Sequence, residues 1–122
     1  MEDHTGIFPV GNNLPNVDYQ ELYRAVIKQV IKDFYPFAIL SEIPAFLHSD
    51  IIKSTISQLI HVVLKNNPSQ LQQILYRIDI SEKKLISVRA ELTEAERHDV
   101  LVDMILLREA QKVWIRKKSA DY

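Results

Sequence analysis

Hydrophobic residues recur at helical spacing through most of the chain after residue 17, and this periodicity predicts an all-α fold. In the first stretch, residues 18–34, the apolar positions form one stripe and the charged positions lie opposite it. Asp18 is a favourable N-cap residue, and Glu21 stands three residues later, as in a capping box. We therefore predict a helix over residues 18–34.

Residues 50–65 carry a second apolar stripe, rich in isoleucine, leucine and valine, that covers half of the helical circumference. The Asn-Asn-Pro sequence at residues 66–68 should end this helix, with asparagine as a left-handed cap in place of glycine. Between the two helices, Pro36 and Pro44 bracket an apolar segment. Because proline suits the first turn of a helix and breaks its interior, we expect one or two short helices within residues 35–49.

Two interpretations apply to residues 68–91. In the first, a helix begins at the proline and continues to residue 78, and a capping box at residues 79–82 opens a separate helix. In the second, one kinked helix spans the whole stretch. The last and longest helix is expected over residues 94–118, because residues 93–96 have a capping-box sequence and the basic residues at its end complement the helix dipole.

The remaining segment, residues 1–17, contains both glycines and two of the five prolines of the chain, so it cannot be a long helix. We consider three roles for this arm: a frayed terminus, a segment docked on its own bundle, and a swapped arm that clasps a second subunit. Residues 18–122 are expected to form a single helical domain, a compact bundle of four to five helices with an irregular N-terminal arm. The predicted core consists of Leu22, Val26, Val30, Ile52, Ile56, Leu59, Val63, Leu71, Ile74, Leu75, Ile78, Leu85, Leu106, Ala110 and Val113.

The composition removes several classes of active site. The chain has two glycines and no cysteine, which argues against a P-loop, a dinucleotide-binding turn, a thiolate nucleophile and a cysteine-ligated zinc site. A net charge of −1 gives no general attraction to nucleic acid or to a membrane surface. We expect no cofactor, no metal and a cytoplasmic location, since the first residues are acidic and no apolar run reaches membrane-spanning length.

The predicted helix over residues 94–118 is apolar around more than half of its surface, as in a central helix or a subunit interface. We favour self-association. In this helix the pattern places Ile105 near the polar strip, and Glu109 with Lys112 in a solvated strip of ion pairs. The candidate interface residues are Leu107, Trp114, Ile115, Met104 and, from the arm, Phe8.

Asp103 lies within the apolar arc of that helix, so we expect it to be a buried carboxylate that needs a partner. A salt bridge or cap to another helix is the favoured interpretation, and a further possibility is that the arc is simply exposed at this position. Asp99 lies four residues earlier on the same face, so a carboxylate pair that binds a metal or transfers a proton is the alternative.

Other polar pairs carry less weight. Glu94 and His98 have the spacing that can share a metal, and Ser57 and His61 have the same spacing on residues 50–65, but neither pair forms a complete site. Arg116, Lys117 and Lys118 are interpreted as helix-capping cations, with nucleic-acid binding as the alternative.

Taken together, these features favour a non-catalytic helical protein-interaction module, such as an adaptor, a regulator or an accessory subunit. The partner is expected to be a second copy, in a homodimer, or another protein. The alternatives are a small ligand-binding protein or enzyme with a buried acidic site, and a weak nucleic-acid binder that uses its basic C-terminus. Under the favoured hypothesis, Leu107→Lys or Trp114→Glu disrupts association and leaves helicity intact.

Overall fold

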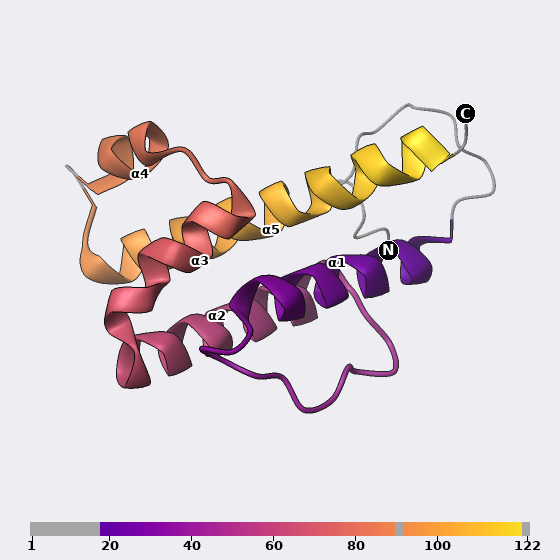
Figure 1. Cartoon of the computed structure of the whole chain (residues 1–122), viewed down its shortest axis with the longest axis horizontal. Coiled ribbons are helices and arrows are strands. Elements are labelled where there is room, and N and C mark those ends of the chain that lie inside the picture. Colours follow the sequence, from indigo (N-terminus) through magenta and orange to yellow (C-terminus); the bar gives the residue numbers. More distant parts are fainter. Residues whose placement is uncertain (1–17, 90–91, 121–122) are drawn as a thin grey trace.

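The computed structural model describes residues 18–89 and 92–120, and in these residues the protein is all-α, without strands. The predicted bundle of four to five helices is confirmed. Figure 1 shows the long helices along the long axis and the short ones at one end of the molecule. The helices are α1 (Tyr19–Phe34), α2 (Ser49–Asn66), α3 (Leu71–Ile78), α4 (Glu82–Arg89) and α5 (Glu94–Ala120), with a 3-10 turn η1 (Pro68–Gln70) before α3.

Side-chain caps define the beginnings of two helices, as the sequence predicts. The carboxylate of Asp18 accepts hydrogen bonds from the backbone N–H groups of Gln20 and Glu21, at 3.0 and 3.2 Å. At the start of α5, the Thr93 N–H donates to the Glu96 carboxylate at 2.9 Å, and the Glu96 N–H donates to the Thr93 hydroxyl at 3.2 Å. Each cap satisfies N–H groups that the first helical turn leaves without a partner.

The connection between α1 and α2 contains no helix, so the prediction of short helices within residues 35–49 is wrong. Side chains of α1 hold this connection in place instead. The Gln20 amide donates to the Leu47 carbonyl and accepts from its N–H, and Arg24 donates to the Ala45 carbonyl. Leu47 is fully buried, so the apolar residue that suggested a helix is an anchor for an irregular segment.

A left-handed residue separates α3 from α4. Asp79 has φ 71° and ψ 50°, and its N–H donates to the Leu75 carbonyl at 3.0 Å. The kinked-helix alternative is therefore wrong, and Asp79 ends α3 rather than opening α4. The left-handed cap expected at the end of α2 is also wrong, because Asn67 has φ −145° and the chain turns directly into η1.

The buried core lies between α1, α2, α3 and α5. Every residue of the predicted core is buried except Leu71 and Leu85, which pack against it while partly exposed. Helix α5 contacts each of the other four α-helices, so it is the central helix of the bundle. Ile105, expected beside a polar strip, is fully buried. In the described residues no helix is both long and apolar enough to cross a membrane.

This placement of α5 can be tested with two alanine variants. Ile105→Ala should lower the free energy of unfolding by about 2–5 kcal/mol, because it leaves a cavity in the core. Leu107→Ala, at a half-exposed position two residues away, should cost less than about 1 kcal/mol. Urea denaturation followed by circular dichroism measures both values, and equal losses would contradict the placement.

Candidate functional site

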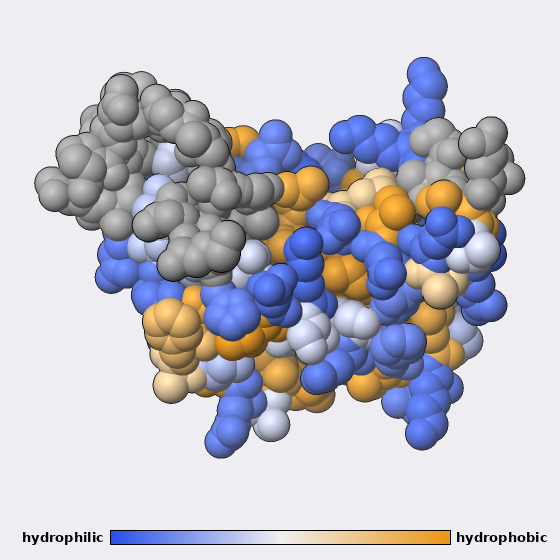
Figure 2. Space-filling view, turned by 180° about the vertical axis from the view of Figure 1, so that it is seen from behind, coloured by the Kyte–Doolittle hydropathy of each residue, from blue (hydrophilic) through white to orange (hydrophobic). Residues whose placement is uncertain are grey.

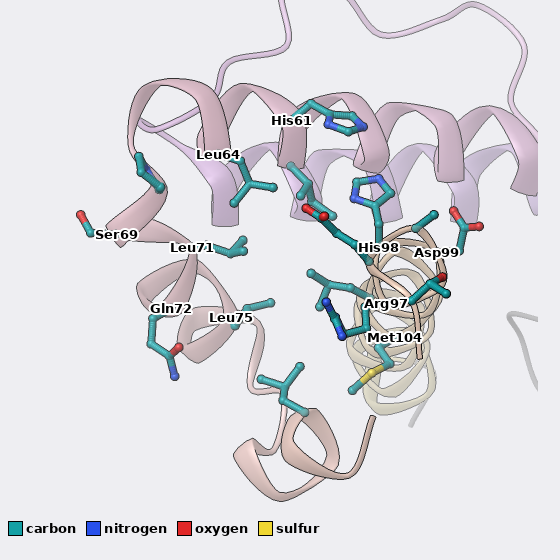
Figure 3. A pocket seen from close by; sticks show the side chains of 17 residues that line it. His61, Leu64, Ser69, Leu71, Gln72, Leu75, Arg97, His98, Asp99 and Met104 are labelled. Atoms are coloured by element: carbon teal, nitrogen blue, oxygen red, sulfur yellow. The ribbon is translucent and has the colours of Figure 1, made fainter. Parts of the chain in front are cut away.

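A groove of about 1170 Å³ lies at the end of the molecule where α3 and α4 meet the first turns of α5. Figure 3 shows Leu71 and Leu75 on one side of the groove, opposite Arg97 and Met104 on the other. Figure 2, which views the molecule from behind, shows hydrophobic surface in the middle of that face and toward this end, between charged side chains. The apolar lining consists of Ile60, Leu64, Pro68, Leu71, Leu75, Leu85, Ala95, Leu101 and Met104.

The edge of the groove between α2 and α5 is polar. The rings of His61 and His98 are stacked, with centroids 4.4 Å apart and planes at 23° (Figure 3). Nε2 of His98 lies 2.8 Å from the Ser57 hydroxyl, which joins α5 to α2 by a hydrogen bond. Arg97 donates to the Leu92 carbonyl at 2.8 Å, so its guanidinium is held where the chain enters α5.

These contacts replace the pairs that the sequence suggested. His98 contacts Ser57 and His61 of α2 rather than sharing a metal with Glu94, and Ser57 contacts His98 rather than His61. A hydroxyl–imidazole pair needs a third group to orient the ring and donors for an oxyanion, and Ser57 does not line the groove. Within the described ranges, no three metal-ligating side chains cluster. The arrangement is therefore one of an apolar binding surface with a polar edge.

Comparisons with protein-family models, curated proteins and solved structures find no match for this chain.

The expected burial of Asp103 is wrong, but the favoured salt bridge to another helix is confirmed. Its side chain is 53% exposed and forms an ion pair with Lys53 of α2, with Nζ and Oδ1 3.2 Å apart. Asp99 is exposed and lines the groove. The reason is the rotation of α5: positions 103, 107, 111 and 115, spaced four apart, face outward together.

The candidate interface residues do not form one surface. Trp114 is only 6% exposed and belongs to the core, whereas Leu107 and Ile115 are 51% and 53% exposed. Met104 is partly buried and lines the groove, and Phe8 lies outside the described residues. Of the candidate basic patch, Arg116 and Lys117 are exposed, and the Lys118 side chain lies outside the described part of the chain.

Sequence reasoning missed the buried acids, which are Glu109 of α5 and Asp33 of α1. Glu109 was assigned to a solvated strip, yet its side chain is completely buried. One signal was present: the residues at i−4, i−3, i+1 and i+4 from Glu109 are all apolar, and a lysine stands at i+3. For Asp33 the sequence contains no comparable signal, since its partner is 79 residues away.

Trp114 and Ile115 are adjacent in α5, but one is buried and the other half exposed, so a pair of variants tests this placement. Trp114→Glu should destabilise the fold by more than about 3 kcal/mol, because it removes a buried ring and places a carboxylate in the core. Ile115→Glu should change stability by less than about 1 kcal/mol, since its side chain is half exposed. Urea denaturation followed by circular dichroism compares them; similar, small losses would show that Trp114 is a surface residue.

Proposed function

We propose that the protein is a non-catalytic interaction module that holds an amphipathic helix of another protein in the groove between α2, α3, α4 and α5. The observation that carries this proposal is the apolar lining of the groove with its polar edge. Amphipathic helices are bound in grooves of this kind, where the apolar face of the helix docks and its polar face stays in water.

The dimensions of the groove support a macromolecular occupant. Sites for small molecules usually enclose about 300–1,000 Å³ and bury most of the ligand surface. Here the volume is about 1170 Å³, and Leu64 on the groove wall is still 44% exposed. A helix that places apolar residues at i, i+3 or i+4 and i+7 would cover Leu64, Leu75 and Met104 from three different helices of the bundle.

Self-association through α5, the form of this function favoured by the sequence, has less support. Trp114 is in the core, and Leu107 and Ile115 are the large hydrophobic residues that α5 leaves exposed in its described part. Two half-exposed side chains offer a small fraction of the ~800 Å² per partner that a stable interface buries. A different protein is therefore the proposed partner, and a second copy becomes an outcome of the experiment.

The other two hypotheses have less support. The ligand-binding or enzymatic alternative relied on a buried Asp103, and that carboxylate is exposed beside Lys53. The nucleic-acid alternative relied on a short basic run, and Arg116 and Lys117 lie at the end of α5, where cations stabilise the helix dipole.

A matched pair of leucine variants tests the groove. A displayed library of amphipathic helical peptides is selected for binding to the wild-type protein, and the selected peptides are then titrated with each variant. Leu64→Glu places a charge on the groove wall and should weaken binding at least about tenfold, or ~1.4 kcal/mol. Leu107→Glu, at a similarly exposed leucine outside the groove, should leave the affinity unchanged.

Circular dichroism controls for folding, and light scattering gives the mass of each variant in solution. The proposal fails if no helical peptide is selected, or if both variants weaken binding equally. A dimer of the wild-type protein that is lost in Leu107→Glu alone would instead establish self-association through α5.

A further inference from the structure

The centre of the bundle contains an ion cluster that the groove does not use. Glu109 of α5 is completely buried, and Asp33 of α1 is almost so. Nζ of Lys112 lies 3.0 Å from Oδ2 of Asp33 and 3.1 Å from Oε1 of Glu109. The amide of Gln29 also donates to Oδ2 of Asp33, at 3.2 Å. Two carboxyl groups from two helices therefore meet at one ammonium group.

The charges of this cluster do not balance if both acids are ionised. Two carboxylates would face one ammonium group, and apart from the ion pair of Oε1 with Lys112, the oxygens of Glu109 have no hydrogen-bond partner within the described chain. The nearby Arg77 does not fill this role, because its guanidinium donates to the backbone carbonyls of Asp33 and Tyr35 and lies over the Phe37 ring. A buried carboxylate without hydrogen bonds is costly, and taking up a proton removes that cost.

We propose that the folded protein binds one exchangeable proton at the paired carboxyl groups of Glu109 and Asp33, and that loss of this proton destabilises the packing of α5 against α1. The direction in which the pKa of Glu109 is shifted agrees with this geometry. The pKa of Glu109 is raised to about 8: burial is the largest cause, the neighbouring Asp33 carboxyl acts in the same direction, and Lys112 acts in the opposite direction.

Arg77 lies beside this cluster and donates to the Asp33 backbone carbonyl, whereas other charged side chains of the packed helices are exposed or paired with other groups. Lys53 pairs with Asp103, and Arg108 pairs with Asp79. Those that are exposed, or bonded to other groups, are Glu21, Arg24, Lys28 and Lys32 of α1, Asp50, Lys53, His61 and Lys65 of α2, Arg77 of α3, Lys83 and Lys84 of α4, and Glu94, Glu96, Arg97, His98, Asp99, Asp103, Arg108, Arg116 and Lys117 of α5.

The sign of the pH dependence follows from linkage. The pKa of Glu109 is higher in the folded protein than its ordinary value of 4.5, so the folded state holds more protons between these two pH values. The stabilisation is complete below pH 4.5 and is lost as the pH rises to about 8. One proton can raise the unfolding equilibrium constant by at most about tenfold per pH unit.

Urea denaturation at pH 6 and pH 9 tests the proposal on the full chain. The wild-type unfolding constant should rise at least about tenfold between these pH values. Glu109→Gln should remove most of this rise and be more stable than the wild type at pH 9. Glu94→Gln, at an exposed acid of the same helix, should keep the wild-type dependence.

A second measurement decides the question even if Glu109→Gln does not fold. In wild-type protein with ¹³C-labelled glutamate, the carboxyl carbon of Glu109 should titrate about three pH units above those of exposed glutamates. A Glu109 carboxyl that titrates with the exposed ones would overturn the proposal, as would an undiminished pH dependence in a folded Glu109→Gln. Neither result depends on the groove, so the proposed interaction function is tested separately.

Discussion

Lys112 reaches into the interior to the carboxyl groups of Asp33 and Glu109, and this cluster joins α5 to α1. Its ammonium group also lies 3.5 Å from the Arg77 carbonyl, so α1, α3 and α5 meet at one point. Removing one partner from a buried cluster leaves an uncompensated charge and typically costs 3–5 kcal/mol. We infer that the cluster selects one rotation of a helix whose apolar residues alone permit several.

That rotation positions the groove. With Glu109 inward, the first turns of α5 present Arg97, Leu101 and Met104 to the groove between α2 and α3. The left-handed Asp79 separates α3 from α4 and is also held by Arg108 of α5, with 3.0 Å between the charged atoms. The wall made by the short helices is therefore attached to the same central helix. The same rotation of α5 buries the ion cluster and forms the binding surface.

The parts of the fold that the sequence predicts correctly depend on local interactions. Asp18 and Thr93 cap helices with N–H groups two or three residues away, and the apolar stripes of α1 and α2 repeat within each helix. The connection between α1 and α2 was not predictable, because Gln20 holds Leu47 from 27 residues away. The sequence offered separate α3 and α4 helices as one of two interpretations, but the positive φ of Asp79 was not predictable, since asparagine at residue 67 is as favourable for this conformation and does not adopt it.

The candidate site was harder to predict because it also depends on contacts between residues far apart in the sequence. Its polar edge joins Ser57 and His98, which are 41 residues apart, so the spacing within one helix gave the wrong pairs. For α5, a surface that is apolar nearly all round gives no unique inward direction, and the inward choice depends on Asp33 in another helix.

The measurement that tests this account most directly is cysteine accessibility, because the natural chain has no cysteine. Single cysteines placed in turn at positions 103, 105, 107, 109, 111, 113 and 115 should react rapidly with a maleimide at 103, 107, 111 and 115, and slowly at 105, 109 and 113. Rapid reaction at 109 in a folded variant would show that α5 faces another way and would contradict the account.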